Sequence, residues 1–192
     1  AASYVASASG AYKVIVTNSN GCIDSSNTIT VVVNSLPSAT ITPASATTFC
    51  QGGSVVLNAN TGGGLTYQWR KNGANISGAT SASYTANTSG AYKVIVTNSN
   101  ACYDSSSVVN VVVNTLPAAT ATAASTTTFC QGGSVVLNAN SGSGLTYQWR
   151  KDGANISGAS ASSYTATTSG SYKVVVTNSS SCSDSSSAVV VT

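Results

Sequence analysis

The five cysteines are the residues of this 192-residue chain best suited to covalent chemistry. Cys22, Cys102 and Cys182 are spaced 80 residues apart, and Cys50 and Cys130 have the same spacing. Cysteines at fixed positions of a repeat are typical of disulfides formed in an oxidising compartment. A metal site is the weaker interpretation, because the chain has neither a histidine nor a Cys-x-x-Cys pair. We therefore expect disulfides, with no metal and no cofactor.

Catalytic chemistry has few suitable groups in this sequence. A nucleophilic serine needs a neighbouring base, and the chain contains no histidine to supply one. All four acidic residues are aspartates, and Asp152 stands where the preceding repeat has Asn72. No repeat therefore has a recurring pair of carboxylates for acid–base catalysis, and we predict that the protein is not an enzyme.

Asp104, with Asn98 and Asn100 close by, offers oxygen ligands for calcium. Calcium takes about six to eight oxygens, usually including several carboxylates. A single aspartate in a loop more often accepts hydrogen bonds from nearby backbone amides. We favour this turn-capping role over a calcium site.

The cysteine spacing belongs to a repeat of 80 residues that extends through the chain. The ten residues 9–18 are identical to residues 89–98, and residues 169–178 are a near copy. We predict three segments: residues 1–36, the C-terminal half of a repeat; residues 37–116, a complete repeat; and residues 117–192, a further repeat. Because half a sandwich cannot bury its own apolar face, we interpret the chain as part of a longer array.

Alternating apolar and polar residues predict β-strands throughout each repeat. In residues 89–98, Tyr92, Val94 and Val96 share one face of the predicted strand, since successive side chains point to opposite faces. About seven such strands in each repeat, without any helical pattern, are typical of an immunoglobulin-like fold. We expect an all-β protein of tandem immunoglobulin-like antiparallel β-sandwiches in a head-to-tail array.

The strand phases also predict the core and one turn. Asn72-Gly73 favours a type I′ hairpin turn, because both residues tolerate positive φ. The inter-sheet disulfide common in immunoglobulin domains is missing, because its two positions hold Ala59 and Val94. Apolar side chains must fill the core instead, and the expected members are Leu57, Trp69, Tyr92, Val94, Trp149 and Tyr172.

Several motifs together resemble a known group of proteins. They are the Phe-Cys-Gln-Gly-Gly-Ser-Val-Val-Leu run of residues 49–57, Tyr67-Gln68-Trp69, Asn72-Gly73, residues 76–80, Tyr84 and the Ser-Gly-Ala-Tyr of residues 89–92. The chain resembles the immunoglobulin-like repeats of giant surface proteins of gliding Bacteroidetes, which are exported by the type IX secretion system. This resemblance covers the whole chain, and it implies an adhesin or the shaft of an extracellular appendage.

Composition also favours a secreted protein. Charged residues are 6% of the chain, against about 25% in ordinary soluble domains. The net charge of +3 is diffuse, so we expect no nucleic-acid partner. The longest uninterrupted apolar runs are a few valines, so we expect no membrane insertion. We predict an extracellular or cell-surface location.

The leading functional hypothesis is a mechanical one. We predict a non-catalytic stalk segment of a giant adhesive surface protein, whose partners are neighbouring repeats and an unidentified extracellular target. The alternative is a glycan- or polysaccharide-binding module. Trp69 and Trp149 are poor candidates for sugar platforms, because their phase places them in the core. Arg70, Lys71 and Lys93 lie on the outer face and could hold an acidic polysaccharide weakly.

A stripe of outward-facing apolar residues suggests lateral association of identical chains in a filament. Ile95 and its equivalents Ile15 and Val175 face outward by strand phase, and Val112 and Val32 are expected on the adjoining strand. A patch that recurs in every repeat would be buried periodically between parallel chains. The other interpretation is that β-branched residues are present for their strand propensity alone.

Two cysteine pairings are compatible with the spacing. Pairing within repeats gives Cys50–Cys102 and Cys130–Cys182, whereas pairing between repeats gives Cys50–Cys182. From Ala59 and Val94, the first two cysteines lie nine and eight residues away in opposite directions along parallel strands. At ~3.3 Å per residue, Cys50 and Cys102 are then more than ~20 Å apart, although a disulfide needs Cα atoms within ~7 Å. We prefer the inter-repeat pairing, and the intra-repeat pairing remains open.

Overall fold

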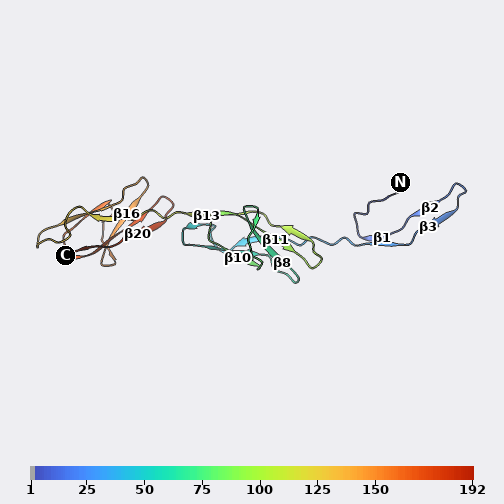
Figure 1. The fold of residues 1–192 in the computed structure, drawn as a ribbon, viewed down its shortest axis with the longest axis horizontal. Coiled ribbons are helices and arrows are strands. Elements are labelled where there is room, and N and C mark those ends of the chain that lie inside the picture. The colour runs from blue at the N-terminus through green and yellow to red at the C-terminus, as the bar shows by residue number, and fades with distance from the viewer. Residues whose placement is uncertain (1–2) are drawn as a thin grey trace. The chain divides into compact units, whose positions relative to one another are not determined.

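The computed structural model describes residues 3–192; residues 1 and 2, at the start of the predicted first segment, lie outside this description. All regular elements of the described residues are β-strands, drawn as arrows in Figure 1. Residues 3–192 contain no helix long and apolar enough to cross a membrane. The expected all-β class is confirmed.

Contacts between Cα atoms divide the chain into two compact units. The first contains the chain up to Thr42, together with Leu57–Tyr84 and Ala91–Val109. The second contains Pro43–Val56, Thr85–Gly90 and Asn110–Thr192. Since the division runs through residues 37–116, it does not follow the 80-residue period. The three repeat boundaries given above therefore stay a prediction.

The third repeat, residues 117–192, forms two antiparallel sheets. The first sheet has the order β14 (Ala121–Ala123), β15 (Val135–Ala139), β18 (Ser163–Ala166). The second has the order β17 (Ala154–Asn155), β16 (Thr146–Lys151), β19 (Gly170–Thr177), β20 (Ser183–Ser185), and β21 (Val189–Val191) also pairs with β19. This is the expected immunoglobulin-like sandwich.

Both sheets of the third repeat contribute side chains to one core. Its buried members are Val135, Leu137, Trp149, Ala166, Tyr172, Val174, Val176 and Val191. The indole Nε1 of Trp149 donates to the Ala161 carbonyl at 3.0 Å, and the Tyr172 hydroxyl donates to the Thr168 carbonyl at 2.8 Å. The two large aromatic side chains are therefore buried with their polar atoms satisfied.

The second repeat contains the corresponding strands. They are β5 (Ile41–Pro43), β6 (Thr48–Cys50), β7 (Val55–Ala59), β8 (Thr66–Lys71), β9 (Ala74–Asn75), β10 (Ser83–Ala86), β11 (Gly90–Thr97), β12 (Tyr103–Ser105) and β13 (Val109–Asn114). Strand β8 pairs antiparallel with β11, so that Trp69 lies opposite Val94. Leu57, Trp69, Tyr92 and Val94 are all fully buried, as expected for the core.

The turn between β8 and β9 is the predicted one. Lys71 lies opposite Ala74, which leaves a two-residue loop. Asn72 and Gly73 have φ values of 50° and 84°, and positive φ at both positions defines the type I′ turn. In the third repeat, Asp152 has φ 49° at the same position.

The first segment has four short strands. They are β1 (Gly10–Tyr12), β2 (Ile15–Thr17), β3 (Ile23–Ser25) and β4 (Ile29–Val31). Strand β1 pairs with β4 and β2 with β3, both antiparallel. Residues 3–6 form no strand. Their equivalents in the third repeat pair with β15, and the first segment contains no counterpart of β15.

Two further strands complete the second repeat. Phe49 and Cys50 belong to β6, which pairs in parallel with β13. A short strand, β12, precedes β13, and residues 106–108 separate the two. The Ser106 hydroxyl accepts a hydrogen bond from the Val94 amide at 3.1 Å and donates to the Ser107 carbonyl at 2.9 Å.

Candidate functional site

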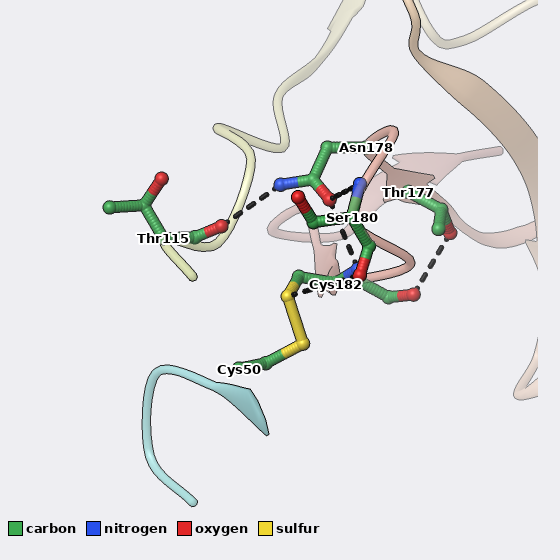
Figure 2. The surroundings of a disulfide bond; sticks show 7 residues. Cys50, Thr115, Thr177, Asn178, Ser180 and Cys182 are labelled. Atoms are coloured by element: carbon green, nitrogen blue, oxygen red, sulfur yellow. Dashed lines mark hydrogen bonds between the residues drawn. A yellow bond between two sulfur atoms is a disulfide. The ribbon is translucent and has the colours of Figure 1, made fainter. Parts of the chain in front are cut away.

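The loop between β19 and β20 is organised by one asparagine side chain (Figure 2). The Asn178 Oδ1 accepts hydrogen bonds from the backbone amides of Ser180 and Cys182, both at 3.0 Å. The backbone amide of Asn178 donates to the Cys182 carbonyl at 2.9 Å, and Ser181 has a φ of 60° within the loop. These bonds fix the direction in which the Cys182 side chain leaves the backbone.

The same asparagine also holds the linker that follows β13. Its Nδ2 donates to the Thr115 carbonyl at 2.9 Å, as Figure 2 shows. Thr115 lies just before Leu116-Pro117, where the second repeat ends by sequence. A loop of the third repeat is therefore tied to the end of the second.

Cys50 reaches this junction because β6 runs parallel to β13. Their register places Cys50 opposite Asn114, the last residue of β13. The Gln51 amide donates to the Asn114 carbonyl at 2.8 Å, so the pairing continues one residue past the strand. Two parallel strands that end together bring Cys50 to the point at which the chain leaves the second repeat.

Cys50 and Cys182 form a disulfide between consecutive repeats (Figure 2). Their Cα atoms are 5.5 Å apart, and 132 residues separate them in sequence. Cys182 is fully buried. The intra-repeat pairs Cys50–Cys102 and Cys130–Cys182 are not formed, since Cys102 and Cys130 are free thiols, as is Cys22.

The second repeat has the same arrangement of loop and linker, but its cysteine, Cys102, is a free thiol. The Asn98 Oδ1 accepts from the amides of Asn100 and Cys102, both at 3.0 Å, and its Nδ2 donates to the Ser35 carbonyl at 2.9 Å. The Cys102 sulfur lies 4.0 Å from the Asn34 carbonyl oxygen. Loop, linker and cysteine thus have the same relation as around Cys182.

The role of these asparagines was not predicted from the sequence. Asp104, the expected cap, accepts a hydrogen bond from the adjacent Ser105 amide at 2.7 Å. The signal was present in the sequence, because an asparagine precedes each of Cys22, Cys102 and Cys182 by four residues. Residues 3–192 contain no group of three potential metal-ligating side chains.

A pair of basic side chains recurs on the outer face. Arg70 on β8 lies opposite Lys93 on β11, and Arg150 lies opposite Lys173 in the third repeat. Each pair lines a shallow hollow, of about 270 Å³ in the second repeat and about 300 Å³ in the third. Each arginine also donates from Nη2 to the carbonyl of the glycine in the adjacent turn.

The apolar stripe predicted for lateral contacts is only partly exposed. Ile15, Val32 and Val112 are exposed, whereas Ile95 and Val175 are half-buried within their own units. Ile95 lies between Gln68 and Ser105 on the neighbouring strands, and these side chains share its face.

Comparison with known proteins gives neither a family nor a curated relative that matches this chain. Similar solved structures include murine CEACAM1b, with 15% identity over 81% of this chain and 99% of that chain and a TM-score of 0.37. They also include three N-terminal domains of the Hoc capsid protein of bacteriophage RB49, with 21% identity over 80% and 59% and a TM-score of 0.40. At such scores, the fold assignment rests on the strands and core described above.

A third similar structure is SGBP-B of the Bacteroides ovatus mixed-linkage glucan utilization locus, solved in complex with a mixed-linkage heptasaccharide. It has 16% identity to this chain over 76% of this chain and 42% of that chain, and its TM-score is 0.32.

Proposed function

We propose that this chain is a non-catalytic, load-bearing stalk segment of an extracellular adhesive protein. The observation that carries the proposal is the Cys50–Cys182 disulfide, which joins two consecutive repeats covalently. A cytosolic compartment keeps most thiols reduced, so the bond also favours an extracellular location. The low charge of the chain and its resemblance to surface proteins of gliding Bacteroidetes support the same role.

The disulfide changes the path that a pulling force takes through the chain. A force applied to the two ends passes from Cys50 directly to Cys182, because the sulfur–sulfur bond is the shorter covalent route. The residues between them form a closed loop and bear no tension. Trp69 and Trp149, at the centres of the two sandwich cores, both lie inside this loop. Load therefore cannot extend the chain between Cys50 and Cys182, which contains both tryptophans, while the bond is intact.

Single-molecule stretching tests this proposal. The oxidised protein, pulled by its ends, should reach a full extension shorter by roughly 450 Å than the reduced protein, because 132 residues at about 3.3–3.6 Å each remain locked. Cys50→Ser should give the longer extension without reductant. Cys130→Ser removes a thiol outside the bond and should leave the short extension unchanged. Equal extensions for the oxidised protein and Cys50→Ser would contradict the load-bearing role.

Binding of acidic polysaccharide is the second candidate function, and the paired basic residues favour it. Like charges directly opposite each other on neighbouring strands are destabilising. Arg70–Lys93 and Arg150–Lys173 nevertheless recur at the same register positions. A sulfate or carboxylate group lying in the hollow between each pair would neutralise this repulsion.

Titration with heparin, as a model acidic polysaccharide, tests the second function. Binding should weaken as salt rises, and Lys93→Gln with Lys173→Gln should reduce it several-fold. Lys13→Gln is the matched control, because the first segment has the equivalent lysine but no counterpart of Arg70. Equal losses in the control and in the double variant would show diffuse charge attraction only.

We also propose that identical chains associate laterally through the apolar stripe of Ile15, Ile95, Val175, Val32 and Val112. Its three exposed members, Ile15, Val32 and Val112, support the proposal. Ile95 and Val175 are half-buried, so each would contribute only the exposed edge of its side chain to the contact between chains.

A further inference from the structure

The basic hollows of the second and third repeats differ by one charge in the adjacent hairpin turn. The second repeat has Asn72 in this turn, where the third repeat has Asp152. We propose that the second-repeat hollow is the main site for one oxyanionic group of an acidic polysaccharide, a sulfate ester or a carboxylate, and that Asp152 weakens the equivalent site in the third repeat. The inference rests on the second candidate function proposed above and adds which repeat recognises the group and which residue decides it.

Two cationic side chains lie side by side at the second-repeat hollow. Arg70 lies directly opposite Lys93 in the pairing of β8 with β11, and residues in such a pair have their side chains on the same face of the sheet. Both residues line the hollow. The Arg70 guanidinium is also held in position, because its Nη2 donates to the Gly73 carbonyl. A guanidinium that is already ordered loses little freedom when it binds an oxyanion.

The protein itself leaves the charge of this arginine uncompensated. The Arg70 Nε is buried and has no hydrogen-bond partner among residues 3–192. None of the described residues that line the hollow is acidic. An unpaired buried donor of a charged group carries a free-energy cost. Because the positive charge is delocalised over the whole guanidinium, an anion in the hollow compensates it without touching the covered Nε.

Asn72 adds hydrogen-bond donors to the same hollow. Its Oδ1 accepts from the Ala91 backbone amide at 2.9 Å, and both residues line the hollow. In the part of the chain that the structure describes, no group accepts a hydrogen bond from the Asn72 Nδ2. The Nδ2 carries two donor hydrogens, and arginine and lysine side chains are donors only. The three side chains together therefore suit a ligand group that only accepts, as an ionised sulfate ester or carboxylate does.

Asp152 reverses the contribution of this third side chain. The backbone of the turn is the same, with a φ of 49° at Asp152 and 50° at Asn72. The Asp152 Oδ1 accepts from the Ser171 amide at 2.8 Å, as the asparagine does from its own partner. Ser171 lines the third-repeat hollow together with Arg150 and Lys173, so the carboxylate adjoins that hollow. Its negative charge repels an incoming oxyanion and partly neutralises the basic pair.

The lysine of the second repeat is also better placed for binding an anion. Lys93 is half-buried, whereas Lys173 is exposed. Val108 lines the second-repeat hollow, and the smaller Ala188 stands at the equivalent position of the third repeat. Charges that are partly removed from water interact more strongly and are screened less by salt. Lys93 should therefore attract an oxyanion more strongly than Lys173 does.

An NMR titration of the whole chain with a heparin tetrasaccharide measures the two sites separately. Gly73 lines the second-repeat hollow and Gly153 lines the third-repeat hollow, so their backbone amide signals report on one site each. The Gly73 signal should reach half of its full shift at a roughly fivefold lower concentration than the Gly153 signal, because the second-repeat site has no carboxylate beside it.

Exchange of the two turn residues tests the assigned cause. Asn72→Asp should raise the midpoint of the Gly73 titration about fivefold, and Asp152→Asn should lower the Gly153 midpoint by a similar factor. Both variants should fold, because each new residue already forms this turn in the other repeat and accepts the same amide bond. Asp184→Asn is the matched control, since it changes the net charge equally but does not line the hollow, and it should leave both midpoints unchanged.

A tetrasaccharide of galacturonate, which carries carboxylates and no sulfate, distinguishes the two ligand groups. Saturation of the Gly73 shift by both sugars would support a site that accepts either oxyanion. Saturation by heparin alone would support a site for sulfate esters.

The titrations separate failure of this inference from failure of polysaccharide binding. Equal midpoints at Gly73 and Gly153 in the original chain, or an unchanged Gly73 midpoint in Asn72→Asp, would overturn the inference although the chain still binds the sugar. Equal effects of Asp152→Asn and Asp184→Asn would overturn it too, because net charge alone would then set the affinity. Without a saturable shift at either glycine with either sugar, the proposed polysaccharide function fails, and the inference fails with it.

Discussion

Asn178 combines two tasks that are usually divided between residues. Its Oδ1 closes the hairpin loop that holds Cys182, and its Nδ2 holds the linker beside Cys50. Asn98 does the same in the second repeat. The carbonyl and amine ends of an asparagine side chain allow both tasks at once, because one end accepts and the other donates. Aspartate, with the same shape, could perform only the first.

Asn178→Asp should therefore weaken the junction without opening the loop. The variant keeps both acceptor bonds, loses the donor to Thr115 and places a carboxylate against that carbonyl. A lost bond with an unsatisfied carbonyl costs about 1–3 kcal/mol. The Cys50–Cys182 bond should become roughly tenfold easier to reduce in a glutathione redox buffer.

Asn18→Asp is the matched control for this experiment. Asn18 accepts from the Asn20 and Cys22 amides, so it holds the equivalent loop, but it lies far in sequence from the Cys50–Cys182 junction. Its replacement should leave the redox equilibrium of that bond unchanged. A shift of the same size in both variants would show that general loop stability, and not the linker bond, sets the equilibrium.

At the scale of the elements, the sequence predicted the strands and turns that depend on residues close together in the chain. Alternation located β8, β11 and the core tryptophans, and Asn72-Gly73 located a hairpin turn. The parallel pairing of β6 with β13 joins residues more than 60 apart, so no local pattern indicates it. The inter-repeat disulfide was nevertheless the preferred pairing, because counting residues along parallel strands separates Cys50 from Cys102. The bonding partners of Asn178 could not be deduced without the loop conformation.

A buried serine, Ser106, lies between β12 and β13. The Ser106 hydroxyl accepts a hydrogen bond from the Val94 amide. In a continuous strand, a backbone carbonyl would accept this bond instead. Ser106→Ala should lower the urea midpoint of the second repeat, by an amount equivalent to about 1–3 kcal/mol, because the buried Val94 amide loses its partner. Trp69 fluorescence reports this unfolding in a Trp149→Phe background.

The adjacent serine provides the control for this variant. Ser107 is exposed, and its backbone carbonyl, which accepts from Ser106, is kept in Ser107→Ala. This variant should unfold at nearly the original urea concentration. Equal midpoints for Ser106→Ala and Ser107→Ala would contradict the role assigned to the buried hydroxyl.

At the scale of the whole molecule, a disulfide that joins successive repeats stabilises the array rather than the single domain. Each sandwich of about 80 residues is small enough to need additional support. A bond within one repeat would supply such support but leave the linkers free to hinge under load. The Cys50–Cys182 bond instead ties the end of the second repeat to a loop of the third. This is the property expected of a stalk.

Lateral association makes a separate prediction for the intact chain. Ile15→Lys together with Ile95→Lys should shift sedimentation towards the monomer, because charged side chains would be buried at each contact. Lys13→Gln removes a neighbouring charge from the same region and should not promote dissociation. An original chain that already sediments as a monomer at high concentration, or an unchanged double variant, would end the idea.

Non-reducing peptide mapping tests the central claim, the covalent link between repeats, most directly. Trypsin places Cys22 and Cys50 together in residues 14–70, Cys102 and Cys130 in residues 94–150, and Cys182 in residues 174–192. The structure predicts that residues 174–192 are linked to residues 14–70, and chymotryptic cleavage after Phe49 should then retain the link on the fragment that begins at Cys50. Recovery of residues 174–192 linked to residues 94–150, which contain Cys102 and Cys130, would contradict the load path proposed for this chain.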